Sequence, residues 1–113
     1  MKRSEIWTVA GGKDYAGKPR PVVIVQDDRF DDTKSITICP FTTNPAEAPL
    51  FRLKVEPDAE NGLRAVCRLM VDKITTVAKS QVRTRVGRLA DEDIVQLNRA
   101  ILVFLGIAAP AKK

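Results

Sequence analysis

The chain has 113 residues, and its 19 lysines and arginines outnumber its 14 aspartates and glutamates, which gives a formal net charge of +5. This length is typical of one domain, and no apolar run approaches the roughly 18–20 residues that a membrane-spanning helix needs. The chain contains no histidine, which excludes a histidine acid–base pair, a Ser-His-Asp triad and a histidine-ligated metal. Any catalysis must therefore come from arginine, lysine, carboxylates and hydroxyls.

The two cysteines, Cys39 and Cys67, are too few for a four-ligand zinc site. The start, Met1-Lys2-Arg3-Ser4-Glu5, lacks the apolar stretch of a signal peptide, so a disulfide framework is not expected. We expect a single cytoplasmic domain over residues 1–113 with buried structural thiols, no bound metal and no membrane contact.

The first half of the chain is predicted to be β-structure. The segment Glu5–Ala10 is β-prone, and the β-branched run Pro21–Val25 indicates a strand that is buried on both faces. An Asp-rich turn follows, with Phe30 as its one apolar anchor. Ser35–Cys39 alternates as a half-buried strand does, and we expect Pro40 to end its ladder.

The second half continues this pattern up to the last segment. Residues 51–55 alternate apolar and basic side chains, and residues 60–62 form an Asn-Gly turn signal. Further strands are expected within 66–71, 74–77 and 85–89. The sequence therefore predicts consecutive antiparallel strands.

The end of the chain changes to a helical period. We expect a helix over about 91–106 with Asp91 as its N-cap, followed by a tail over 108–113. The apolar residues recur at helical spacing and form one stripe: Ile94, Leu97, Ile101, Phe104, Leu105 and Ala108. Strands followed by one terminal helix indicate a small, mainly β fold, a β-barrel or curled sheet with the helix packed on it.

The basic charge is concentrated between residues 64 and 88. That segment holds one acid, Asp72, and seven bases: Arg64, Arg68, Lys73, Lys79, Arg83, Arg85 and Arg88. Residues 27–32 show the reverse, with four aspartates against one arginine. This distribution suits a polyanion partner, either a nucleic acid or an acidic protein, but it equally fits a solvated strand surface.

Three side chains before residue 45 are candidates for chemistry. Arg20 lies between Pro19 and Pro21, which stiffen the backbone, and its guanidinium offers the donors that match a phosphate. Thr42 and Thr43 could donate to a phosphate or a developing oxyanion. A surface arginine and two packing threonines are the ordinary alternatives.

Two further features are weaker. Tyr15, in a Gly-flanked loop, is a candidate for stacking on a base or for gating. The polar residues 72–76 fit either a binding patch or a solvated face with a local Asp–Lys pair.

Several pieces together resemble the MazF/PemK family of toxin endoribonucleases, and the order and spacing of the pieces fit across nearly the whole chain. The pieces are Glu5-Ile-Trp, Gly17, the segment Arg20–Gln26, Thr42-Thr43 and Asp72-Lys73-Ile74-Thr75. The resemblance implies an SH3-like, CcdB/MazF-type antiparallel β-barrel with a C-terminal α-helix, usually as a homodimer.

The resemblance also implies an activity. Family members cleave single-stranded RNA, including mRNA, without metal or cofactor, by attack of the ribose 2′-hydroxyl, leaving a 2′,3′-cyclic phosphate and a 5′-hydroxyl. The catalytic arginine of the family falls on Arg20 and its active-site threonine on Thr42, with Thr43 beside it. Some relatives carry an acid where this chain has Met70, and we expect Asp72 to substitute for it from the same strand face. The first-loop histidine of PemK-like members has no counterpart here.

The implied partners are single-stranded RNA and an acidic antitoxin whose flexible segment covers the basic groove. The residues expected to bind RNA are Lys18, Tyr15, Arg68, Lys73, Lys79 and Arg83. Two alternatives stay open: a CcdB-like gyrase-inhibiting toxin on the same fold without nuclease activity, and a small barrel that only binds nucleic acid.

Overall fold

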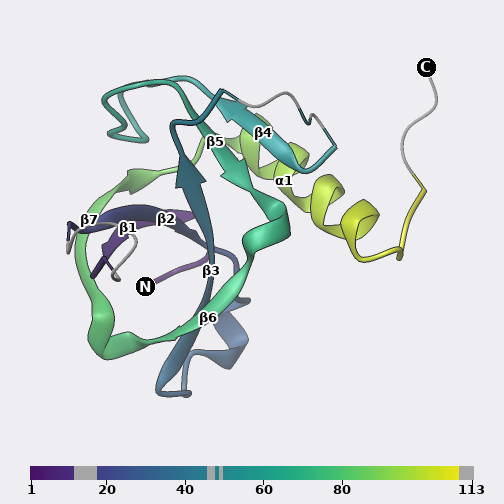
Figure 1. The fold of residues 1–113 in the computed structure, drawn as a ribbon. Coiled ribbons are helices and arrows are strands. Elements are labelled where there is room, and N and C mark those ends of the chain that lie inside the picture. Colours follow the sequence, from purple (N-terminus) through teal and green to yellow (C-terminus); the bar gives the residue numbers. More distant parts are fainter. Residues whose placement is uncertain (12–17, 46–47, 49, 110–113) are drawn as a thin grey trace.

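The computed structural model describes residues 1–11, 18–45, 48 and 50–109, and within them the chain forms seven strands and one α-helix (Figure 1). The strands are β1 (Glu5–Val9), β2 (Arg20–Ile24), β3 (Ser35–Thr42), β4 (Arg52–Val55), β5 (Cys67–Met70), β6 (Thr75–Ala78) and β7 (Val82–Arg88), and the helix is α1 (Asp91–Phe104). The predicted order of strands followed by one helix is confirmed.

All the strand pairs are antiparallel, and the sheet has the order β4-β5-β3-β2-β1-β7, with β6 paired to β3 off this path. One edge of β3 is shared, because residues 35–38 pair with β6 while Phe41 and Thr42 pair with β5. The sheet therefore curls, and β6 and β7 pass around the open side (Figure 1). The result is a barrel-like sheet, in which no hydrogen-bonded ladder between β6 and β7 closes the ring among the described strands.

The expectation that Pro40 ends its strand is wrong, because β3 continues to Thr42. The carbonyl of Thr37 accepts the N–H of Val25, so Thr37 and every second residue after it direct their backbone groups toward β2. Pro40 therefore faces the other edge, between the last residue paired to β6, Ile38, and the first paired to β5, Phe41. At that position a proline removes no ladder hydrogen bond.

The strand β2 has apolar side chains on both faces, as predicted. Val23 lies in a cluster beneath α1, whereas Val22 and Ile24 lie in a second cluster inside the curl of the sheet. Cys39 and Cys67 belong to the first cluster and are unbonded thiols. Burial, with a smaller effect of a nearby carboxylate, raises the pKa of the Cys39 thiol to about 12, so that it stays protonated at neutral pH.

The helix α1 covers the first cluster with only part of its predicted stripe. Leu97 is buried, and Ile94 and Ile101 are half-buried against the cluster, but Phe104 and Leu105 are 48% and 63% exposed. The last turn extends past the sheet (Figure 1), so both side chains stay largely exposed, although the Phe104 ring lies 6.1 Å from the Phe51 ring. Residues 110–113, most of the predicted tail, lie outside the described residues.

The predicted N-cap of α1 is also wrong. The cap residue is Ala90, which makes no side-chain capping bond, and Asp91 is the first helical residue. The Asp91 carboxylate accepts a hydrogen bond from Arg88 at 3.2 Å instead. The three acids of the first turn still complement the positive end of the helix dipole.

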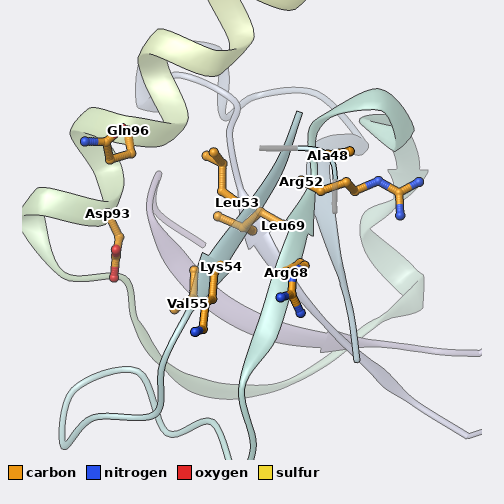
Figure 2. A pocket seen from close by; sticks show the side chains of 9 residues that line it. All are labelled: Ala48, Arg52, Leu53, Lys54, Val55, Arg68, Leu69, Asp93 and Gln96. Carbon is orange, nitrogen blue, oxygen red and sulfur yellow. The ribbon is translucent and has the colours of Figure 1, made fainter. Parts of the chain in front are cut away.

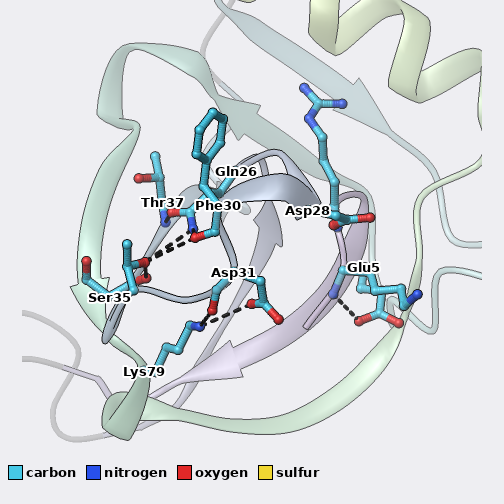
Figure 3. A network of polar contacts seen from close by, with 11 residues as sticks. Glu5, Gln26, Asp28, Phe30, Asp31, Ser35, Thr37 and Lys79 are labelled. Atoms are coloured by element: carbon cyan, nitrogen blue, oxygen red, sulfur yellow. Dashed lines mark hydrogen bonds and ion pairs between the residues drawn. The ribbon is translucent and has the colours of Figure 1, made fainter.

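The Asp-rich turn is held by polar contacts and not by Phe30, which is 58% exposed. The amide of Gln26 donates to the Phe30 carbonyl at 2.9 Å, and the Lys79 ammonium donates to the Asp31 carboxylate at 3.1 Å (Figure 3). The expectation that Phe30 anchors the turn is therefore wrong. Because enough polar donors and acceptors lie nearby, the aromatic ring is not needed for the turn.

The predicted turn at residues 60–62 is confirmed, and a buried asparagine organises it. The side-chain oxygen of Asn61 accepts the N–H groups of Asp58 and Leu63 at 3.1 and 2.9 Å, and its amide donates to the Glu56 carbonyl at 2.9 Å. Gly62 has a φ of 68°, in the left-handed region that glycine adopts without strain. This loop joins β4 to β5.

Candidate functional site

Arg20 lies at the mouth of the curled sheet. It is the first residue of β2, is exposed, and pairs with Val9 of β1. Its side chain lines a cavity of about 300 Å³ whose walls come from the ends of β1 and β2, from β3 and from β6. The other described lining residues are Val9, Ala10, Gly11, Val22, Ile38, Pro40, Phe41, Thr75, Val77 and Gln81.

Thr42 lies next to Arg20 by strand register. Val22 pairs with Pro40, so the same register continued by two residues sets Arg20 opposite Thr42. Residues directly opposite each other in an antiparallel pair project from the same face of the sheet. The half-buried Thr42 hydroxyl also accepts the N–H of Asn44 at 3.1 Å, which fixes the turn that follows the strand. Thr43 is exposed and lies just beyond the strand.

A glycine allows two backbone segments beside Arg20 to approach each other closely. A Cβ added to Gly11 would lie 2.0 Å from the carbonyl oxygen of Lys18, so only glycine permits this approach of the two chain segments. Lys18 is exposed and precedes β2. Tyr15 and Gly17, both singled out by the sequence, lie outside the described residues.

Two polar residues that sequence reasoning did not single out individually share the cavity with Arg20. Thr75 is the first residue of β6 and pairs with Ile38 of β3, and Gln81 precedes β7. Among the described residues, neither side chain has a hydrogen-bond partner in the structure. No local sequence signal points to Gln81. Thr75 belongs to the polar residues 72–76 noted in the sequence, but only the pairing of β6 with β3 brings it to this mouth.

Asp72 lies elsewhere. The expectation that it shares a strand face with Met70 is wrong, because Asp72 lies in a 3₁₀ turn, Val71–Lys73, and not in a strand. Its carboxylate accepts two hydrogen bonds from the Arg52 guanidinium, at 2.8 and 2.9 Å. These bonds hold the pKa of Asp72 below its ordinary value. It lines a separate hollow beside the end of α1, and among the described residues it is not part of the Arg20 cavity wall.

The four basic residues expected to bind RNA after residue 60 are spread over the molecule. Arg68 is half-buried on β5 opposite Thr42, whereas Lys73 is exposed in the 3₁₀ turn. Lys79 is bound by the Asp31 carboxylate, and Arg83 donates to the Ser80 carbonyl at 3.0 Å. The geometry therefore brings only Arg68 of these four beside Thr42.

Among the described residues, ion pairs engage at least three of the seven bases between residues 64 and 88. They are Lys79 with Asp31, Arg85 with Glu5, and Arg88 with Asp91. The segment is thus not one continuous basic groove.

The Glu5-Ile-Trp piece has a structural explanation. The Glu5 carboxylate accepts hydrogen bonds from the Lys2 backbone, the Trp7 indole and the Arg85 guanidinium, at 2.8, 3.1 and 3.2 Å. Burial alone would raise the pKa of Glu5, but these donors outweigh it and the net pKa is lowered. The contacts fix β1 against β7, and the far end of β1 borders the Arg20 cavity.

The arrangement at the mouth places a guanidinium and a hydroxyl on one face beside an open cavity. A guanidinium remains charged at any physiological pH and presents several donors, so it can hold a phosphate and stabilise added negative charge. A neighbouring hydroxyl can donate to another oxygen of the same group. The cavity beside them has walls that are mostly apolar, as a site for a planar base requires.

Comparison with known proteins gives a consistent family. A sequence model described as a PemK-like, MazF-like toxin of type II toxin–antitoxin systems matches residues 2–105. The chain is 56% identical over 108 residues to a protein of Mycolicibacterium smegmatis named probable endoribonuclease MazF, covering 96% of this chain and 99% of that protein. It is 29% identical over 117 residues to endoribonuclease MazF9 of Mycobacterium tuberculosis, covering 95% and 98%.

The fold has solved counterparts. A mycobacterial endoribonuclease, solved in complex with its cognate antitoxin, matches with a TM-score of 0.79 at 19% identity, covering 97% of this chain and 99% of that chain. This likeness confirms the expected barrel-like fold with a C-terminal helix. Among the described residues, no helix is long and apolar enough to cross a membrane.

Proposed function

The chain belongs to the PemK-like, MazF-like family of type II toxin–antitoxin toxins, and from this we propose that it is a toxin endoribonuclease that cleaves single-stranded RNA. The identity of 56% to a protein named as an endoribonuclease supports this activity, and so does the length of the match. The main support is structural: Arg20 and Thr42 lie opposite each other by strand register, and Arg20 lines the cavity beside them.

The proposed reaction uses the RNA's own nucleophile. The ribose 2′-oxygen bonds to the adjacent phosphorus while the bond to the 5′-oxygen breaks, so the products are a 2′,3′-cyclic phosphate and a 5′-hydroxyl. The proton lost by the 2′-hydroxyl is balanced by the proton gained at the 5′-oxygen. Arg20 binds the non-bridging oxygens as negative charge develops, and Thr42 donates to one of them. Arg20 is not assigned the role of base, because a guanidinium in a protein does not give up its proton.

The partners follow from charge and exposure. A net charge of +5 suits RNA and an acidic antitoxin, which would compete for the same surface. The exposed apolar side chains Leu102, Phe104 and Leu105 at the end of α1 offer a contact for a second copy of the chain, so we include a homodimer in the proposal. The two proposed partners, RNA and an antitoxin, support a cytoplasmic location, which we include in the proposal.

The gyrase-inhibiting alternative is not favoured by the family match. Such a toxin would need neither Arg20 nor Thr42. A passive nucleic-acid binder is not favoured by the 56% identity to a protein named as an endoribonuclease.

The test is incubation of the purified protein with a long single-stranded RNA in EDTA, with sequencing of the ends. We expect cleavage at defined sites, with 2′,3′-cyclic phosphate and 5′-hydroxyl ends, and its loss in Arg20→Ala. A gyrase-dependent DNA-cleavage assay run in parallel should be negative. Failure to cleave any of a varied set of RNAs, or cleavage that persists in Arg20→Ala, would overturn the proposal.

A further inference from the structure

The row of side chains that begins with Arg20 and Thr42 continues across the sheet. Thr42 of β3 pairs with Arg68 of β5, and Arg68 pairs with Lys54 of β4. The neighbours Phe41, Leu69 and those on either side of Lys54 lie in or against the core cluster under α1. Since strand side chains alternate between faces, Thr42, Arg68 and Lys54 all project from the opposite face.

The row runs across the sheet from β2 to the edge strand β4. Neighbouring strands lie about 4.8 Å apart, so three steps from Arg20 on β2 to Lys54 on the edge strand β4 span about 14–15 Å. The long side chains of arginine and lysine extend that reach. The row is thus long enough to follow a nucleic-acid strand for more than one phosphate, starting at the proposed site of cleavage.

A groove accompanies the far part of the row. It lies at the β4 edge of the sheet, has a volume of about 390 Å³, and is lined by Arg52, Lys54 and Arg68 together with Asp93 and Gln96 of α1, which reaches this edge from the other face. Figure 2 shows the ends of Lys54 and Arg68 side by side, whereas the Arg52 guanidinium points away from them. The Asp72 carboxylate binds the Arg52 guanidinium, and Lys54 and Arg68 are the other two basic residues among the described lining residues.

The acids near the row are few. Glu56 lies 4.0 Å from the Lys54 ammonium, with both side chains more than half exposed, and such a pair contributes little. Asp93 is the one acid among the described lining residues. Among the described lining residues the bases thus outnumber the acids, which suits a polyanion.

We propose that the RNA strand leaving the Arg20–Thr42 site crosses β5 and β4, with Arg68 and Lys54 each binding a backbone phosphate. This inference rests on the proposed RNA cleavage and deepens it by assigning the path of the substrate. Lys54 did not stand out in the sequence, because an alternating Arg-Leu-Lys strand reads as a solvated face.

Both side chains are assigned to phosphates and not to bases. The described wall of the groove contains no aromatic residue on which a base could stack, and the cations themselves match phosphate oxygens. Phosphate contacts carry no sequence information. The loss of Lys54 or Arg68 should therefore weaken binding of all RNA sequences alike and leave the cleavage sites unchanged.

The test measures how RNA binding depends on salt. A single-stranded RNA in which every 2′-hydroxyl is replaced by 2′-O-methyl serves as a probe that is bound but not cut, because it lacks the attacking group. For single strands, each phosphate contact contributes about 0.7 to the slope of log K against log salt. We expect Lys54→Ala and Arg68→Ala each to reduce that slope by about 0.7, and Arg68→Lys to retain it.

Lys34→Ala is the matched control, because it removes one exposed lysine beside the first residue of β3, at the opposite end of that strand from Thr42. It should leave the slope unchanged. On cleavable RNA, the row variants should raise KM with little change in kcat.

Slopes equal to that of the unaltered protein in both row variants, or an equal loss in Lys34→Ala, would overturn the proposed path while RNA cleavage stands. An unaltered protein that binds the probe with these slopes but cuts no RNA would instead refute the proposed function alone. Thermal unfolding of each variant confirms that the half-buried Arg68 is not required for folding.

Discussion

The two ends of β3 differ in how their charges are arranged. Near Ser35, where the strand begins, the Asp-rich turn binds cations: Asp31 holds Lys79 and Asp27 holds Arg29. Near Thr42, where the strand ends, the cross-strand neighbours are cations, and the acids close to them are few among the residues that the structure describes. The net charge of +5 alone therefore does not say where a polyanion binds. The positions of the charged side chains decide which end of β3 attracts it.

Bases that are close together in the sequence therefore do not necessarily form a basic surface in the folded protein. The densest run of bases, residues 64–88, supplies three ion pairs that join strands, loops and the helix. Arg20 and Lys54 come from outside that run, and strand register is what sets them in a row with Arg68. Variants at the two ends of β3 test this difference.

The largest effect is expected from Arg20→Ala. Removing a group that stabilises charge in the transition state typically lowers kcat by about 10²–10³-fold. Arg20 is exposed, so thermal unfolding should be unchanged. The measurement is single-turnover cleavage of RNA, with Arg29→Ala at the acidic end as control. A loss of similar size in Arg29→Ala would contradict the contrast between the two ends.

A smaller loss, about tenfold, is expected from Thr42→Val, which keeps the shape and removes the hydroxyl. The measurement is kcat for RNA cleavage, compared with Thr43→Val. Because Thr42 lies in the register opposite Arg20 and Thr43 lies past the end of β3, the first variant should lose more. The reverse order would move the active hydroxyl to Thr43.

Asp72→Asn should act on stability. The Arg52–Asp72 pair is mostly buried, with side chains 16% and 21% exposed, and a hydrogen bond to a charged group contributes about 1.5–3 kcal/mol. The folded-state pKa of Asp72 is lowered, chiefly by the hydrogen bonds from Arg52. Its stabilisation is therefore present above the unfolded pKa and is lost as the pH falls toward the folded value.

Urea unfolding at pH 7 and at acid pH measures this effect, with Asp31→Asn, in a more exposed pair, as the control. The two proteins should differ by the stated amount at pH 7 and converge in acid. A catalytic role for Asp72 remains a prediction, and it requires a loss of cleavage rate in the folded variant that its stability does not explain.

Much of the fold could be predicted because local patterns determined it. The buried run at β2, the alternation in β3 and β4, and the period of α1 are confirmed. The prediction that Pro40 ends its strand is wrong because a strand tolerates a proline or not depending on which edge the proline faces. Phe104 belongs to the predicted apolar stripe but is largely exposed, because helical spacing identifies the stripe and not where the sheet beneath it ends.

The candidate site was only partly predictable, for a related reason. Arg20 and Thr42 carry local signals and a family resemblance. Thr75 shares in the resemblance, but Gln81 and Lys54 carry neither. Thr75 and Lys54 reach the same face as these two only through pairings between distant strands. Such register is set by the whole sheet, so a single segment does not reveal it.

The smallest effect concerns the one acid at the basic end. Asp93 faces the groove of Lys54 and Arg68, and burial, with repulsion by Glu92 and Asp58, raises its pKa. Asp93→Asn removes a charge that repels phosphate, so RNA affinity at low salt should rise about two- to threefold, in keeping with the ~0.5 kcal/mol typical of such exposed pairs. The gain should vanish at high salt because screening removes it.

Asp91→Asn is the control for Asp93→Asn, since it removes a carboxylate from the same helical turn, and so from the same helix dipole, outside the described groove wall. If both variants gain equally, the effect is one of net charge. A gain confined to Asp93→Asn means that RNA passes between β4 and α1, because only a phosphate close to that carboxylate distinguishes two acids two residues apart.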